Sequence, residues 1–254
     1  DPTVRVIQAT GLTGTPIATV VSFACHPTIL PAESRAISAE FPGAMRRTMK
    51  LPGQVLFVNG AAGDISTRFT RLSQDSAEVE QVGRALAEAA RTAIAAARPI
   101  EGELGRGVVK VNLPVRSVSD VETAGELALV AESRLATGAL NSAEIRIEQT
   151  RIQGAMILER LAESGMTHVA RSVEIPWWRL GDLRLIGIPG ELFASLGADL
   201  VESLPDSLVL GYTNGYVGYL PDRAAYTAGL YEALASPYAE GVGEALVEAL
   251  VGKL

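Results

Sequence analysis

The sequence is poor in cysteine and histidine, the residues most often used for covalent cross-links and for metal binding. It contains one cysteine and two histidines among 254 residues. The single cysteine, Cys25, excludes a disulfide within the chain, and its apolar surroundings predict a buried, unreactive thiol. Because there are only two histidines, His26 and His168, the role of each can be considered separately.

Long apolar runs and clustered positive charge are also missing. No stretch reaches the roughly 20 apolar residues that a membrane-spanning helix needs. The 22 Lys and Arg residues are outnumbered by 29 Asp and Glu, which gives a net charge of −7. Since the basic residues are scattered as well, a nucleic-acid partner is disfavoured. A hydrophobic content of 48% is typical of a globular protein, and the length suits one large domain.

Strand and helix patterns alternate along the chain. Short apolar or alternating runs predict strands, and apolar residues at helical spacing predict helices. The expected strands cover residues 4–9, 17–25, 55–58, 108–115, 173–180, 183–188 and 208–211. The expected helices cover residues 38–49, 76–97, 121–135, 141–161, 191–204 and 239–254. Ser38 and Asn141 are candidate N-caps. This order predicts an α/β fold with a mixed β-sheet core, flanking helices and a single domain.

A strand that runs into a glycine-rich turn is the most suggestive single stretch. Residues 55–58 are strand formers, and the following turn contains Gly60, Gly63, Asp64 and Ser66. Ligands of open α/β sheets commonly bind beyond the carboxyl ends of strands. Asp64 and Ser66 are therefore either site residues or ordinary caps of the next turn.

Three further segments end strands with reactive side chains. His26 follows an apolar strand and is either a metal ligand, a base or a structural histidine. Glu191 follows Pro189-Gly190 and either interacts with the dipole of the next helix or points at the sheet edge. Among the tyrosines that follow residue 211, Tyr216 and Tyr219 are candidates for packing, metal ligation or oxyanion binding. His168 lies in a polar connection and is expected at the surface.

These side chains form a mixed nitrogen and oxygen donor set if the four strand ends meet at one edge. An imidazole, a carboxylate and a phenolate suit Zn²⁺, which can activate water or polarise a carbonyl. Spacing by itself leaves this convergence open.

Four ordered motifs carry a resemblance to a known family. They are FACHPT at residues 23–28, GDIS at 63–66, PGELF at 189–193 and NGYVGY at 214–219. Together they resemble the catalytic domain of the neutral/alkaline (non-lysosomal) ceramidases, over about residues 1–243. That family hydrolyses the amide bond of N-acylsphingosines with a zinc ion held by two histidines, a glutamate and a tyrosine.

The resemblance implies a role for five residues of this chain. His26, Glu191 and Tyr219 match the second zinc histidine, the zinc glutamate and the zinc tyrosine. Ser66 matches the serine that is essential for catalysis, and Tyr231 matches a second active-site tyrosine. The resemblance is to the shorter bacterial relatives of this family, because the C-terminal immunoglobulin-like domain of the well-known ceramidases is absent from this sequence.

Two departures from the family pattern shape the expectations. The family's first zinc histidine, in a His-x-His-Ser-Gly segment, has no counterpart here. Residues 1–254 are therefore expected to be the larger C-terminal part of a catalytic domain, completed by an N-terminal segment or a second chain. Thr67-Arg68 replaces the Pro-Asn that commonly follows the family serine, which leaves the substrate open.

The sequence thus predicts a zinc-dependent amidohydrolase that acts on N-acyl lipids such as ceramide. The open alternatives are hydrolysis of another N-acyl or ester substrate at the same metal, and a catalytically silent binding module of the same fold. The resemblance also implies contact with a membrane surface that presents the substrate, and a secreted or periplasmic location. Residue composition itself does not fix a compartment.

Overall fold

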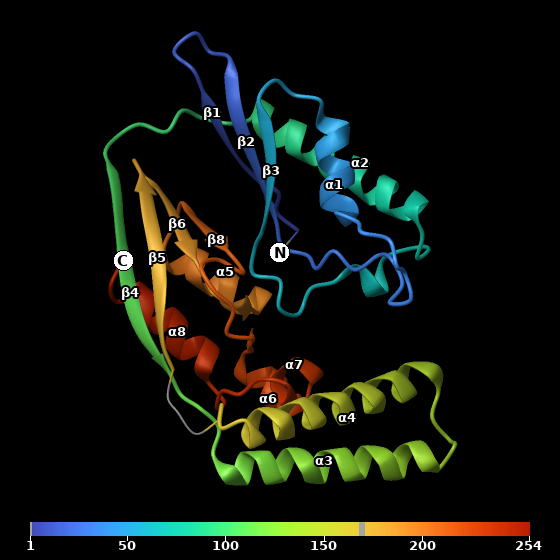
Figure 1. The fold of residues 1–254 in the computed structure, drawn as a ribbon. Coiled ribbons are helices and arrows are strands. Elements are labelled where there is room, and N and C mark those ends of the chain that lie inside the picture. Colours follow the sequence, from blue (N-terminus) through green and yellow to red (C-terminus); the bar gives the residue numbers. More distant parts are fainter. Residues whose placement is uncertain (1, 168–170) are drawn as a thin grey trace.

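The computed structural model describes residues 2–167 and 171–254. Its first sheet comes from the start of the chain: β1 (Arg5–Thr10) and β2 (Pro16–Phe23) form an antiparallel hairpin, and β3 (Gln54–Asn59) pairs with β2 in parallel. Two helices, α1 (Glu40–Met49) and α2 (Ser76–Ala95), pack together beside this sheet (Figure 1). Their inner faces bury a first apolar core on which the hairpin and β3 rest.

A second sheet has the strand order β4-β5-β6-β8. Its strands are β4 (Leu104–Leu113), β5 (Arg171–Leu180), β6 (Leu183–Gly187) and β8 (Ser207–Leu210). The first three strands are antiparallel and β8 runs parallel to β6. Helices α5 (Ala194–Ser203) and α8 (Val242–Val251) pack against this sheet and complete a second core (Figure 1).

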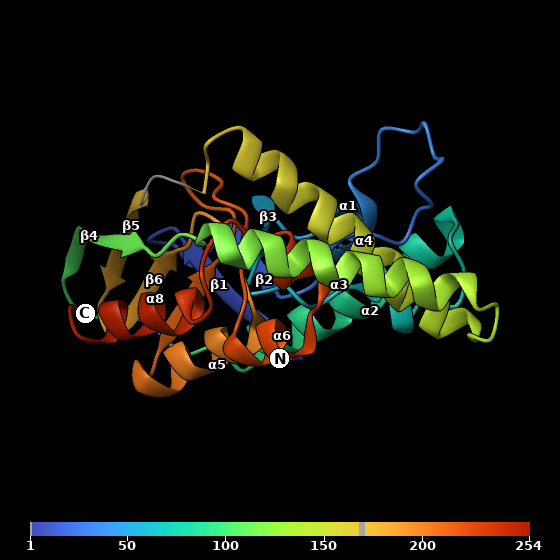
Figure 2. The same ribbon diagram turned by 90° about the horizontal axis from the view of Figure 1, so that it is seen from below.

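A long helical pair lies beneath both sheets. Helices α3 (Val118–Ala136) and α4 (Ser142–Glu163) run side by side in both views, and the short helix α7 (Tyr231–Leu234) packs on α4 (Figures 1 and 2). Each long helix begins with a capping box, at Ser117 and Asn141. Helix α6 (Arg223–Ala228) precedes α7, and β7 (Glu191–Leu192) pairs with β9 (Tyr219–Leu220).

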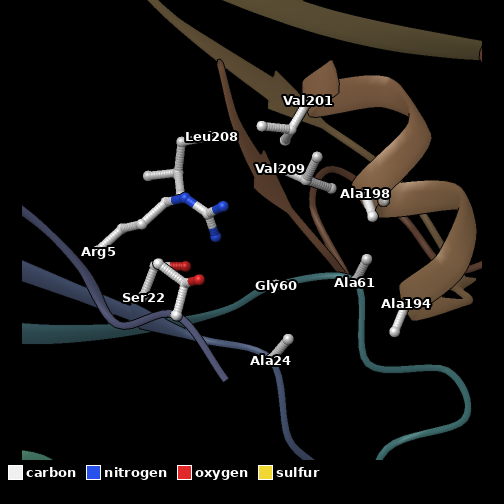
Figure 3. A pocket seen from close by; sticks show the side chains of 12 residues that line it. Arg5, Ser22, Ala24, Gly60, Ala61, Ala194, Ala198, Val201, Leu208 and Val209 are labelled. Atoms are coloured by element: carbon white, nitrogen blue, oxygen red, sulfur yellow. The ribbon is translucent and has the colours of Figure 1, made fainter. Parts of the chain in front are cut away.

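The two sheets meet where β3 and β8 end. The backbone N–H of Gly211, directly after β8, donates to the main-chain oxygen of Asn59 at 2.9 Å. Figure 3 shows the seam beside this contact, where Arg5 reaches toward β8 and Ala61 lies beside α5. The pocket in this part of the seam has a volume of only about 20 Å³, which is enough for about one water molecule. The two cores are therefore closely docked.

The predicted α/β class with mixed strand pairing in a single domain is confirmed. Two local predictions were wrong. The helix expected to begin at Glu191 begins at Ala194, because residues 191–192 pair with β9 instead. Ser38 does not cap α1; the N-cap is Ala39, which makes no side-chain capping bond, and the Ser38 hydroxyl accepts from the N–H of Glu40.

Two expectations concern the membrane and the second histidine. None of the described helices combines the length and the apolar character that a bilayer span requires. The expectation for His168 falls outside the described residues.

The close packing of α1 on α2 gives a test of the first core. A Cβ atom at Gly83 of α2 would lie 2.4 Å from the Cβ of Ala44 and 2.8 Å from the backbone nitrogen of Met45. We expect Gly83→Ala to push the helices apart and lower the free energy of unfolding by about 1–3 kcal/mol, as overpacked cores do. Denaturant unfolding measures this.

Gly125 provides the matched control, because it also lies inside a helix but has open space around its missing Cβ. Gly125→Ala should raise the free energy of unfolding by about 0.5–1 kcal/mol through helix propensity. Equal effects of the two substitutions would show that α1 and α2 are not as closely packed as described.

Candidate functional site

His26 is held by the backbone on both sides. Its N–H donates to the carbonyl of Ile65 at 2.8 Å, and an isolated parallel bridge pairs His26 with Ser66. Directly before it, the N–H of Cys25 donates to the side-chain Oδ1 of Asn59 at 3.1 Å. Cys25 is 6% exposed and burial raises its thiol pKa to about 11, as expected for an inert cysteine. The backbone that carries the imidazole is therefore fixed directly after β2.

Glu191 is positioned by a two-residue strand rather than by a helix terminus. Its N–H donates to the carbonyl of Gly218 at 2.9 Å, and its register partner in β9 is Tyr219. On the other side, the N–H of Gly63 donates to the carbonyl of Leu192 at 2.9 Å. The glycine-rich turn after β3 thus packs against β7 and brings Ser66 to the same region as Glu191.

The carboxylate of Glu191 is the centre of a polar cluster. Its Oε2 atom lies 3.1 Å from His26 Nε2 and 3.1 Å from the hydroxyl of Tyr212. The same hydroxyl lies 3.2 Å from His26 Nδ1 and 3.5 Å from His26 Nε2. Tyr216 donates to the other carboxylate oxygen, Oε1, and its ring stacks on that of Tyr212. Both carboxylate oxygens therefore have polar partners.

Burial and charge act in opposite directions on this cluster. Burial raises the pKa of Glu191, but hydrogen bonds from His26 and Tyr216 and the charge of His26 outweigh it, so the net pKa lies below the usual value. Burial and the Glu191 carboxylate raise the pKa of Tyr212, Tyr216 and Tyr219. The cluster consequently contains an ionised carboxylate among protonated phenols.

A cavity of about 500 Å³ opens beside the cluster. Four of the five predicted site residues line it: His26, Ser66, Tyr219 and Tyr231. The fifth, Glu191, is 5% exposed and reaches the cavity through its contact with His26. The rings of Tyr219 and Tyr231 lie edge to face with centroids 6.0 Å apart. The structure thus gathers the five side chains in one region, while their individual roles stay predictions.

The wall that carries Tyr231 is fixed by charged groups of the long helical pair. Glu148 of α4 is 2% exposed and accepts at 3.2 Å from Arg151. Arg151 also donates to the main-chain oxygens of Ala228 and Gly229, at the end of α6. A hydrogen-bonded ion pair with a buried carboxylate and a partly exposed guanidinium therefore anchors the segment that leads into Tyr231.

The donor types present fit a divalent metal, although they include few of the most familiar ligands. Within residues 2–167 and 171–254, no three His, Cys, Asp or Glu side chains gather as a metal-binding group. His26 supplies a nitrogen donor and Glu191 an oxygen donor, and these two atoms lie 3.1 Å apart. The remaining donors nearby are phenols. Such a set suits Zn²⁺ if a tyrosine serves as a ligand.

Tyr212 is the residue that the sequence reasoning missed. The predicted ligand Tyr219 forms no hydrogen bond with His26 or Glu191 within the described chain, whereas Tyr212 contacts both. Tyr212 adopts φ 58°, a left-handed conformation uncommon for a residue with a side chain. Its position directly after the apolar strand 208–211 is the one sequence signal that could have identified it, since the other site residues also follow strands.

Comparison with known proteins gives a structural match. No family model matches the chain, and no curated protein matches its sequence. The fold matches the crystal structure of neutral ceramidase from Pseudomonas aeruginosa with a TM-score of 0.65 and 16% identity, over 97% of this chain and 45% of that chain. It matches a ceramidase complexed with C2 with a TM-score of 0.70 and 16% identity, over 99% of this chain and 47% of that one.

These matches confirm the predicted resemblance at the level of the fold. The described elements reproduce a ceramidase-like fold, and the chain spans less than half the length of either ceramidase. At 16% identity, the likeness concerns fold, and activity needs its own argument.

The hydrogen bond between the side chain of Asn59 and the backbone of Cys25 gives a test of how the site is held. Asn59→Ala removes the acceptor for the N–H of Cys25, directly before His26. We expect the free energy of unfolding to fall by about 1–3 kcal/mol, the usual effect of leaving a buried donor unpaired. Chemical denaturation checks the size of the loss.

Asn59→Asp serves as the control because it keeps an acceptor oxygen at the same position. It should retain more stability than Asn59→Ala. If the two variants unfold at the same denaturant concentration as the unsubstituted protein, the side chain of Asn59 does not hold the Cys25-His26 segment.

Proposed function

We propose that this chain carries the active site of a zinc-dependent hydrolase that cleaves the amide bond of an N-acyl substrate, as ceramidases do. The observation that supports this most directly is that a nitrogen donor, His26, and an oxygen donor, Glu191, lie beside a cavity lined by Ser66 and Tyr231. The ceramidase-like fold supports the same reading.

The proposed division of roles is the one that the ceramidase resemblance implies for these side chains. His26, Glu191 and Tyr219 would hold the metal, which would supply a Lewis acid and a means of lowering the pKa of water. Ser66 lines the cavity and either attacks the carbonyl carbon or positions the attacking water. Its hydroxyl accepts at 3.4 Å from the backbone N–H of Arg68. The hydroxyl hydrogen is free to point at a base or a substrate.

Tyr231 is proposed to stabilise the negative charge that forms on the carbonyl oxygen. It lines the same cavity as Ser66, and burial raises the pKa of its hydroxyl, which keeps the proton available for donation. A preplaced donor of this kind contributes most in a site shielded from water. The neighbouring Glu232 has a pKa raised by burial and lines the cavity as well.

The proposal is tested with zinc analysis and a panel of N-acyl substrates that includes ceramide. The purified protein should hold about one zinc ion per chain and release fatty acid from at least one substrate. Ser66→Ala and Tyr231→Phe should leave bound zinc unchanged, and Tyr231→Phe should reduce kcat by about 10²–10³, as loss of an oxyanion donor does.

Protein that binds zinc without hydrolysing any member of the panel would favour the silent binding module instead. Loss of zinc from Tyr231→Phe would show that Tyr231 is a ligand and that its role is misassigned.

The second candidate, hydrolysis of an N-acyl substrate other than ceramide, is favoured by charge at the cavity. Arg68 and Arg146 line the cavity, both are exposed, and neither forms an ion pair with another described residue. Ile147 and Phe69 lie next to them and add apolar surface, 48% and 93% exposed. This combination suits an acyl chain joined to a group that carries a carboxylate.

Matched substrates test the second candidate. We expect a substrate with a carboxylate on the amine side to have a higher kcat/KM than its neutral amide analogue. Arg68→Gln or Arg146→Gln should lower kcat/KM about 10-fold for the anionic substrate, because a charged hydrogen bond is lost.

The neutral substrate should be nearly unaffected by either substitution. Arg160→Gln, on the exposed surface of α4 and away from the cavity lining, is the control and should change neither rate. A preference for the neutral analogue would exclude this candidate and leave ceramide-like substrates.

A further inference from the structure

Glu232 places a carboxylate on the wall of the cavity. It is the second residue of α7 and lines the same cavity as Ser66. The cavity has another carboxylate, that of Asp64, but it accepts from the backbone N–H of Ala194 at 2.8 Å. Within the described chain, the Glu232 carboxylate forms no ion pair and no hydrogen bond with another side chain. It is therefore free to act on a molecule in the cavity.

The backbone around Glu232 is held by buried neighbours. Ala233 and Leu234, the next two residues, are 1% and 4% exposed. The guanidinium of Arg116 donates to the carbonyls of Ala233 and Ser236 and so fixes the end of α7. Because the following residues are anchored in the interior, Glu232 is presented to the cavity from a fixed position.

The charged groups that act on Glu232 surround Ser66. Asp64 precedes Ser66 and Arg68 follows it in the turn after β3, and His26 pairs with Ser66 in an isolated parallel bridge. Since the effect of a charge fades with distance, Glu232 lies within range of all three groups. Its carboxylate therefore faces the turn that carries Ser66, in the cavity that both residues line.

Amide hydrolysis needs a proton donor that the roles assigned so far do not include. The leaving nitrogen must take up a proton while its bond to the carbonyl carbon breaks, since a nitrogen anion is a very poor leaving group. In the proposed function, Ser66 or water attacks and Tyr231 stabilises the oxyanion, so neither serves the nitrogen. A carboxyl group transfers a proton near neutral pH more readily than a phenol does.

We propose that Glu232 delivers the proton to the leaving nitrogen. The inference rests on the proposed function and adds a catalytic residue to it. The Glu232 carboxylate takes the proton of the attacking hydroxyl as the carbon–oxygen bond forms, and gives it to the nitrogen as the carbon–nitrogen bond breaks. If Ser66 attacks first, water repeats the step and Ser66 recovers its proton. The carboxylate is regenerated, so the complete reaction consumes only the amide and water.

Burial supports this role. It is the main cause that raises the pKa of the Glu232 carboxyl, and the carboxylate of Asp64 acts in the same direction. A backbone hydrogen bond and the positive charges of Arg68 and protonated His26 act against them, but the net pKa lies above its usual value. A raised pKa makes the carboxylate a better acceptor for the proton that it then passes on.

The test compares two substrates of the same fatty acid: the N-acyl amide that the protein hydrolyses fastest and the p-nitrophenyl ester. The amide needs a proton on its leaving group, whereas p-nitrophenolate leaves without one. Glu232→Gln should lower kcat for the amide about 10²–10⁴-fold, as loss of a proton-transfer group does. The loss for the ester should be at least about 10-fold smaller, and KM should change little for either substrate.

Two further variants separate chemistry from structure. Glu232→Asp keeps a carboxyl group and should recover part of the amide activity that Glu232→Gln loses. Glu240→Gln is the matched control, because Glu240 is an exposed glutamate that lies outside the cavity lining, and it should change neither rate. Glutamine has nearly the shape of glutamate, so circular dichroism and Tm of Glu232→Gln should stay close to those of the unsubstituted protein.

The outcomes separate this inference from the proposed function. Equal losses with the amide and the ester, or full amide activity in Glu232→Gln, would overturn the inference, and the proposed hydrolase would stand. Unsubstituted protein that hydrolyses no N-acyl amide would overturn the proposed function and the inference with it.

Discussion

One residue, Asn59, holds the two halves of the site in register. Its side-chain oxygen accepts from the N–H of Cys25, the residue before His26. Its main-chain oxygen accepts from the N–H of Gly211, the residue before Tyr212. Because β3 is itself fixed by parallel pairing with β2, the positions of both side chains derive from the end of one strand. The contact between imidazole, phenol and carboxylate depends on this arrangement, since neither sheet contains all three.

The sequence predicted the parts of the molecule that local interactions determine. The capping box at Asn141 is one, because the side chains of Asn141 and Glu144 each accept from the backbone N–H of the other, within four residues. The strand ends that carry His26 and Ser66 are others. Pro-Gly before an apolar segment favours a helix that starts at Glu191, but the residue pairs in a strand with Tyr219, which is distant in the sequence. Tyr212, Tyr216 and Tyr219 share one short segment, and only the three-dimensional pairing separates their contacts with Glu191.

The cavity combines a rigid wall with an exposed rim. On the wall, Glu148 accepts from Arg151, which in turn holds the carbonyls at the end of α6, so Tyr231 begins its helix from a fixed point. On the rim, Arg68 and Phe69 lie in a single 3₁₀ turn after Ser66 and are exposed. Chemistry placed at the wall and recognition placed at the rim would allow substrate preference to change without disturbing the reacting groups.

The docking of the two cores also has a kinetic consequence for anything bound between His26, Glu191 and Tyr212. These residues are far apart in the sequence: His26 follows β2 of the first sheet, Glu191 lies in β7, and Tyr212 follows β8 of the second sheet. No local segment can assemble this arrangement early in folding, because the long loops must close first. In the folded protein, transient opening of the seam would separate the three side chains while each core stays intact. The lifetime of a bound ligand would then be set by the opening of the seam, well before global unfolding.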